Sequence, residues 1–157
     1  MQIQVRRTTL GMARVIRALA DKHGMDLTRV GSRLVLDNEP WMPLHVRVVD
    51  VGIVLVARLT GDATDGPTDP EATYWTPSLD YIDRRVPHPW VPLSLAQPIG
   101  QHSICGLVLG GEMVLAVPHI QRELASFAEA WAQNLTEQRY LENGVLRLLQ
   151  HQEEDEG

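Results

Sequence analysis

Residues 44–59, with the sequence LHVRVVDVGIVLVARL, hold two runs of apolar residues on either side of a short turn. Apolar residues that recur at every second position are typical of a strand with one face in the core. The turn at 50–52 is short enough to join two such strands as an antiparallel hairpin. We expect the core face of this hairpin to carry Leu44, Val46, Val48, Ile53, Leu55, Ala57 and Leu59.

Helical patterns lie on both sides of this hairpin. From Met12 onward apolar residues recur at i, i+3, i+4 and i+7. Thr8 or Thr9 can cap the start of this pattern and Gly24 suits its end, which predicts a helix over about residues 9–23. Pro118 suits the first position of a second helix, since its missing N–H would have no partner there. The apolar stripe of the second helix is expected to be Ile120, Leu124, Phe127, Ala128, Trp131 and Leu135.

Further strand patterns fill the region between the helices. Strands are expected at 30–36, 93–97 and 103–109, and the pair Gly110 and Gly111 predicts a tight turn into another strand at 113–117. Residues 61–92 hold many Pro, Asp and Thr residues, which predicts loop with one short strand at 72–76. Residues 145–150 are expected to form a short apolar turn or helix.

These elements together predict an α+β fold. It consists of an N-terminal helix, an antiparallel β-meander of about five or six strands, and a C-terminal helix packed on the sheet. No helix separates the strands, so parallel winding is not expected. We expect a single domain over residues 1–150 and an acidic, flexible tail at 151–157.

The composition indicates an ordinary soluble protein of a reducing, cytoplasmic compartment. Cys105 is the only cysteine, so no disulfide can form within the chain. No apolar run approaches the ~20 residues that a membrane-spanning helix needs. The formal charge of −6 disfavours broad contact with nucleic acid, which usually requires a basic face. A local basic patch is the alternative, formed by Arg6, Arg7, Arg14 and Arg17.

Carboxylates gather in the turn-rich segment 59–75. The acidic residues of this segment are Asp62, Asp65, Asp69 and Glu71. Carboxylate oxygens are the ligands of hard cations such as Ca²⁺ and Mg²⁺, so Asp62, Asp69 and Glu71 are candidate ligands of a divalent cation. Asp is also a common turn residue, so a purely structural role is the alternative. No nucleophile motif or histidine pair accompanies these residues, and we assign no catalytic residue and no other cofactor.

Large aromatic residues lie beside prolines or in the turn-rich region. Tryptophan and tyrosine are enriched in the energetic centres of protein interfaces, so these residues are candidates for binding a partner. They are Trp41, Tyr74, Trp75 and Trp90. The alternative is that they pack together and fix the loop on the sheet.

Several short motifs occur in order between residues 42 and 140. They are Met42-Pro43-Leu44, Gly61-Asp62 with Asp69-Pro70-Glu71, Pro92-Leu93, and Phe127-Ala128 with Trp131, Asn134-Leu135 and Gln138. In this order the chain resembles an uncharacterised domain family of bacteria, phages and plasmids whose function is unknown. Arg139 stands where that family more commonly has glycine. The resemblance implies a mobile-element setting and no particular reaction.

Polar residues lie beside the apolar stripe of the second helix, and a contact between them and the acidic loop would explain why the loop motif and the helix motif occur together. Asn134, Gln138 and Arg139 are predicted to tether the acidic loop, for example through an ion pair from Arg139 to Asp62 or Glu71.

We therefore expect a non-enzymatic binding or accessory protein, possibly of a phage or plasmid, that acts by protein–protein contact. Inhibition of a host defence or nucleic-acid-processing complex is one concrete form. The alternative is a divalent-metal-dependent enzyme or nucleic-acid-processing factor that uses the acidic loop. Apolar residues beyond the second helix, Val145, Leu148 and Leu149, are candidates for a contact between identical subunits.

Overall fold

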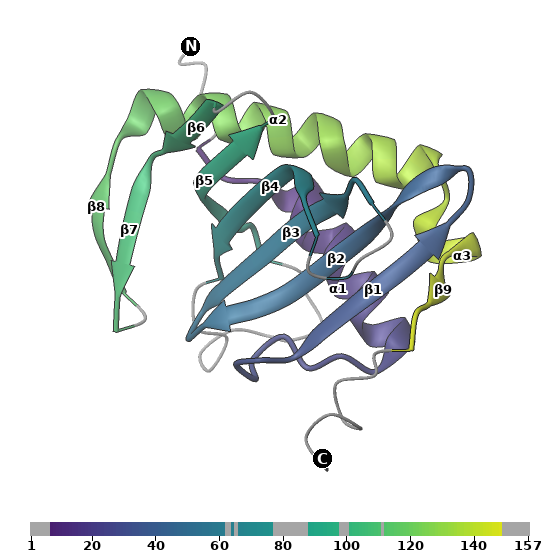
Figure 1. Cartoon of the computed structure of the whole chain (residues 1–157). Helices are drawn as coiled ribbons and strands as arrows, with labels where there is room; N and C mark the ends of the chain where they lie inside the picture. The colour runs from purple at the N-terminus through teal and green to yellow at the C-terminus, as the bar shows by residue number, and fades with distance from the viewer. Residues whose placement is uncertain are drawn as a thin grey trace.

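The computed structural model describes residues 7–61, 64, 66–76, 88–97, 101–110 and 112–148. Helix, strands and helix follow one another in the expected order (Figure 1). The first elements are α1 (Leu10–His23), β1 (Arg33–Asn38), β2 (Trp41–Asp50), β3 (Ile53–Leu59) and β4 (Thr68–Trp75). The later elements are β5 (Val91–Gln97), β6 (Gln101–Ile104), β7 (Gly106–Leu109), β8 (Glu112–Ala116), α2 (Pro118–Glu137), α3 (Tyr140–Asn143) and β9 (Val145–Leu146).

Within the described residues, seven strands form one sheet in the order β6-β5-β4-β3-β2-β1-β9, and β7 and β8 form a separate two-stranded sheet. Every pair of neighbouring strands is antiparallel. Strands β1 to β6 follow one another as a meander, whereas β9 returns from the far end of the chain to lie beside β1. The predicted α+β class and the meander of about five or six strands are confirmed, and β9 extends the sheet to seven strands at one edge.

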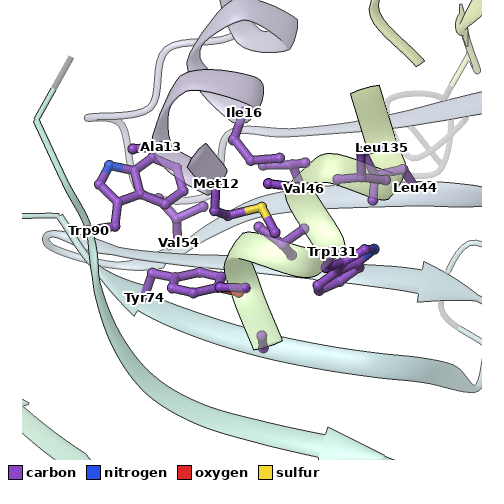
Figure 2. Close-up of a cluster of buried hydrophobic side chains, with 14 of the residues drawn as sticks. Met12, Ala13, Ile16, Leu44, Val46, Val54, Tyr74, Trp90, Trp131 and Leu135 are labelled. Carbon is purple, nitrogen blue, oxygen red and sulfur yellow. The ribbon is translucent and has the colours of Figure 1, made fainter. Parts of the chain in front are cut away.

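Helices α1 and α2 cover one face of the seven-stranded sheet. Figure 2 shows Met12 and Ile16 of α1 packed beside Trp131 of α2, with Val46 and Val54 of the sheet in the same cluster. All five side chains are buried. This face therefore holds the hydrophobic core, and burial of its apolar side chains is the main force that joins helices to sheet.

Helix α1 begins and ends where the sequence predicts. The Thr9 hydroxyl oxygen accepts a hydrogen bond from the Met12 N–H at 3.2 Å, as an N-cap residue does. Gly24 has a φ of 71°, the left-handed conformation in which glycine commonly ends a helix. Local capping chemistry thus sets both boundaries.

A carboxylate of α2 also holds the first turn of α1. Glu129 Oε1 accepts a hydrogen bond from the Leu10 N–H at 3.3 Å, and its Oε2 accepts one from the Gly11 N–H at 3.1 Å. These N–H groups have no partner inside the helix and lie at the positive end of its dipole. A Cβ at position 11 would lie 2.1 Å from Oε2, so glycine makes room for the carboxylate. Glu129 therefore connects the N-terminal end of α1 to the side of α2.

The core face of β3 differs from the expected one. Val54 and Val56 lie in the core, whereas the half-buried Ile53 and Leu55 point to the other face of the sheet. Paired residues of adjacent strands share a face, and the register joins Val46 to Val56. The prediction for Ile53 and Leu55 was wrong because β3 is apolar at both parities, so alternation alone did not select a face.

Strand β4 is longer than the sequence analysis predicted. It begins at Thr68 rather than at residue 72, and its buried positions are Pro70, Ala72 and Tyr74. Strand β4 pairs with β3 on one side and with β5 on the other. Residues 68–71, expected to be loop, therefore lie in the middle of the sheet.

Two further segments differ from the expectation. Residues 103–109 form two strands rather than one, because the chain changes sheet at Cys105. Val145 and Leu146, expected in a turn or helix, form β9 against β1. Arg147 reinforces that edge with an ion pair to Asp37, whose Oδ1 lies 2.6 Å from the Arg147 Nη2.

Candidate protein-interaction surface

The β7–β8 hairpin projects away from the seven-stranded sheet at one end of the molecule (Figure 1). Its strands pair in register from Gly106 opposite Ala116 to Leu109 opposite Glu112. The predicted hairpin is thus confirmed, with Gly110 at its turn in the left-handed conformation, φ 60°. A two-stranded sheet has little stability of its own, so its attachment to the rest of the domain matters.

Cys105 attaches the base of this hairpin to β5. Its N–H donates a hydrogen bond to the Leu93 carbonyl at 2.8 Å, and its own carbonyl accepts one from the Val117 N–H at 2.7 Å. The Cys105 Sγ lies 3.0 Å from the Pro92 carbonyl oxygen and donates to it. Both strands of the hairpin leave the domain at this buried residue.

The inner face of the hairpin rests on the domain. Gly106 and Val108 are buried, and a Cβ at Gly106 would lie 2.8 Å from the Leu93 Cδ2 and 3.2 Å from the Met113 Sδ. Gly106 therefore allows Leu93 and Met113 to pack over the backbone at the base of β7. Among the described residues, this contact leaves the side chains of the opposite face exposed.

The opposite face, here called the outer face, is mainly aliphatic, and its one charged residue is Glu112, which pairs with Leu109 at the tip of the hairpin. A register shift leaves Val114 as an extra residue of β8 between Met113 and Leu115. Val114 is exposed together with its neighbours, and the four outer-face side chains retain between 48% and 62% of their accessible surface. They are Leu107, Leu109, Val114 and Leu115. Because exposed apolar patches are often functional, this concentration of aliphatic side chains makes the outer face a candidate interaction surface.

The sequence predicted the hairpin and missed the exposure of its outer face. A strand with one face in solvent normally carries polar residues on that face. In β7 and β8 both faces are apolar, and Glu112 is the only charged residue among residues 104–117. That absence of polar positions was the signal that could have identified the outer face.

The structure describes two of the three residues proposed as metal ligands. Asp69 and Glu71 lie half-buried on strand β4, not in a loop, while Asp62 and Asp65 lie outside the described residues. Glu71 Oε1 accepts a hydrogen bond from the Thr68 hydroxyl at 3.0 Å. No group of three or more His, Cys, Asp or Glu side chains that could hold a metal occurs among the described residues. The cation hypothesis stays a prediction.

Two of the four candidate aromatic residues belong to the core. Tyr74 and Trp90 retain 1% and 2% of their accessible surface, and their rings lie 5.9 Å apart. The Trp90 backbone also pairs with Thr9 through two hydrogen bonds, of 2.8 and 2.9 Å. The prediction that Tyr74 and Trp90 form a partner surface was wrong, because together they fix the start of α1 to the sheet.

The other two aromatic residues lie far apart on the sheet. Trp41 begins β2 and is 46% exposed, whereas the half-buried Trp75 ends β4 and pairs with Ile53. Because β2, β3 and β4 are successive antiparallel strands, these two positions lie at opposite strand ends. The four aromatic residues do not gather into one surface.

The predicted tethering residues face different partners. Arg139 lies 4.0 Å from Glu142 in an exposed ion pair, and Asn134 is exposed. The Gln138 carbonyl accepts a hydrogen bond from the Asn38 Nδ2 at 2.8 Å, which joins the end of α2 to β1. The predicted tie from Arg139 to Glu71 does not form, because Glu71 is paired within β4. A tie to Asp62 lies outside the described residues.

The remaining candidate sites lie elsewhere on the surface. Arg7 and Arg14 are exposed, Arg17 is half-buried along α1, and Arg6 lies outside the described residues. Val145 and Leu148 are exposed at the β9 edge, and Leu149 lies outside the described residues. None of the helices in the described part of the chain is long and apolar enough to cross a membrane.

Burial leaves Cys105 unsuited to nucleophilic chemistry. Desolvation raises the pKa of the Cys105 thiol to about 11. The thiolate, not the thiol, is the nucleophile of cysteine chemistry, so this group stays protonated at neutral pH. Desolvation also raises the pKa of Tyr140 to about 12, and the Tyr140 hydroxyl donates to the Met42 carbonyl. Both groups have structural partners.

Comparison of the chain with protein-family models, with curated proteins and with solved structures gave no match.

Proposed function

We propose that this chain is a non-enzymatic binding protein that acts by protein–protein contact, with the outer face of the β7–β8 hairpin as the contact surface. The observation that carries the proposal is the exposure of Leu107, Leu109, Val114 and Leu115 on an element that projects from the domain. Their combined apolar area is on the order of 300–400 Å², comparable to the largest patch of a typical monomer, which is often functional.

The surroundings of this face suit a partner that supplies aliphatic or aromatic side chains. Interface centres are depleted of charge, and the hairpin has its one charged residue, Glu112, at the tip. The face is open to solvent, since its four aliphatic side chains are exposed. Inhibition of a host defence or nucleic-acid-processing complex, in a phage or plasmid setting, remains the concrete form of this proposal.

A capture experiment with matched variants tests the contact surface. Tagged wild-type protein, a Leu107→Glu/Leu115→Glu variant and a Leu148→Glu control are incubated with bacterial lysate under mild crosslinking. All three substitutions fall at exposed positions, so we expect each protein to fold. The proposal predicts a stoichiometric protein retained by the wild type and the control and lost from the hairpin variant. Equal retention by all three would exclude the hairpin as the contact surface.

A further inference from the structure

The outer face of the hairpin also has properties that select among possible partners. It consists of four aliphatic side chains, and its only charged side chain is Glu112, at the tip end of the hairpin. Interfaces between different proteins that form and separate are about as polar as the rest of the surface, whereas homodimer interfaces are more apolar. The composition of this face therefore resembles that of a homodimer interface.

The distribution of charge along the chain also bears on which partner fits the outer face. With a formal charge of −6, two copies repel each other over most approaches. The outer face lies on a segment, residues 104–117, whose only charged residue is Glu112. A second copy can approach there with little opposition from like charges. A basic partner, in contrast, would find a single carboxylate on this face, that of Glu112 at the tip.

We propose that the partner of the outer face is a second copy of this chain, packed hairpin against hairpin about a twofold axis. This inference rests on the proposed function of the hairpin as a contact surface. A twofold contact is self-complementary, so each copy contributes Leu107, Leu109, Val114 and Leu115. With the flanking backbone, pairing removes about 1,000 Å² in total, near the low end of specific interfaces. The resulting dimer is expected to dissociate at micromolar concentration.

Packing against a second copy also compensates for the small attachment of the hairpin. Cys105 and Gly106 connect the hairpin to the domain at its base, and Val108 is also buried, whereas the tip at Gly110 has no neighbour within 4 Å of a Cβ built there. Two-stranded sheets need a further layer or strand to be stable. Two hairpins packed through their outer faces supply that layer to each other.

Sedimentation equilibrium between about 2 and 200 µM tests the inference directly, a range that brackets a micromolar dissociation constant. The wild type and the Leu148→Glu control are expected to convert from monomer to dimer across this range, whereas Leu115→Glu and, separately, Leu107→Glu remain monomeric. Thermal unfolding of each variant shows whether it is folded. If one hairpin variant unfolds, the other still gives the answer.

The opposite results are equally clear. A wild-type protein that stays monomeric at 200 µM overturns the inference. So does a dimer that survives both hairpin substitutions and is lost in Leu148→Glu, which would assign the contact to the β9 edge.

The two proposals fail separately. A strictly monomeric protein that captures a host protein only through an intact hairpin refutes the homodimer and supports the binding function. A hairpin-dependent dimer that captures no other protein supports the homodimer and removes the host partner from the proposed function.

Discussion

The β2–β3 and β7–β8 hairpins start from similar sequences and end in different surroundings. Both consist of two short apolar runs joined by a glycine-containing turn. The β2–β3 pair lies in the middle of a seven-stranded sheet under two helices, whereas β7–β8 stands apart with an uncovered outer face. Strand formation is therefore a local property of these runs, while burial depends on which other elements reach them.

The largest expected effect compares equivalent truncations in the two hairpins. Leu44 of β2 is fully buried and Leu115 of β8 is 58% exposed. Replacing Leu44 with alanine should lower the free energy of unfolding by about 2–5 kcal/mol, because it leaves a cavity in the core. Replacing Leu115 with alanine should change it by no more than about 0.5 kcal/mol. Urea denaturation of the two variants, at a concentration low enough to avoid association, measures both values. Similar losses would show that the outer face is covered within the monomer.

A second prediction concerns helices α1 and α2, which cover the sheet that contains the β2–β3 hairpin and leave the outer face of the β7–β8 hairpin exposed. Glu129→Ala removes both hydrogen bonds from the carboxylate to the first turn of α1. We expect the free energy of unfolding to fall by about 1–2 kcal/mol, as for the loss of a charged cap.

Gly11→Ala provides the partner for a double-mutant cycle. The new methyl group displaces the same carboxylate, since its Cβ would lie 2.1 Å from Oε2. The combined variant should therefore lose less stability than the sum of the two single variants. Additive losses would show that Glu129 and Gly11 act independently.

A third prediction uses alkaline pH to weaken the base of the β7–β8 hairpin. The pKa of the Cys105 thiol rises from 9.0 to about 11 on folding, so above pH 9 the unfolded chain loses this proton while the folded chain keeps it. The unfolded state then binds fewer protons, and stability falls as pH rises between these two values. Tyr140, whose pKa rises from 10.0 to about 12, adds to the loss above pH 10.

Melting temperatures measured from pH 7 to 11 test this prediction. The decline should begin near pH 9 in the wild type and nearer pH 10 in Cys105→Ala, which keeps only the tyrosine contribution. Identical profiles for the two proteins would show that the thiol is already solvated in the folded state.

The smallest expected effect is a gain in stability at Arg139, which follows the C-terminal end of α2. Arg139 has a φ of 61°, a left-handed conformation that costs a non-glycine residue about 1 kcal/mol. Its exposed ion pair with Glu142 contributes little in return. Arg139→Gly should therefore raise the free energy of unfolding by about 0.5 kcal/mol. Arg139→Ala serves as the control, because it removes the ion pair without relieving the backbone. A gain in both variants would assign the effect to charge.

Part of the candidate site was predictable and part was not. The pair Gly110 and Gly111 identified the β7–β8 turn, and the absence of polar positions in both strands was visible in the chain. Nothing in the chain indicated that Cys105 would divide one predicted strand between two sheets. Two hydrogen bonds determine that division: the Cys105 N–H donates to the Leu93 carbonyl, and the Val117 N–H donates to the Cys105 carbonyl. The aromatic residues illustrate the same limit, since Trp90 is a core residue only because Thr9 and Tyr74 reach it.

The sequence by itself determined what depends on neighbouring residues. Caps at Thr9 and Gly24, the Pro118 start of α2 and the period-2 strands follow from local sterics and hydrogen bonding, and all appear in the structure. The tertiary structure alone decided which face of β3 enters the core and which face of the β7–β8 hairpin remains exposed. Both runs are apolar on both faces, so their own residues give no preference. The choice follows from strand register and from the helices that cover one sheet and not the other.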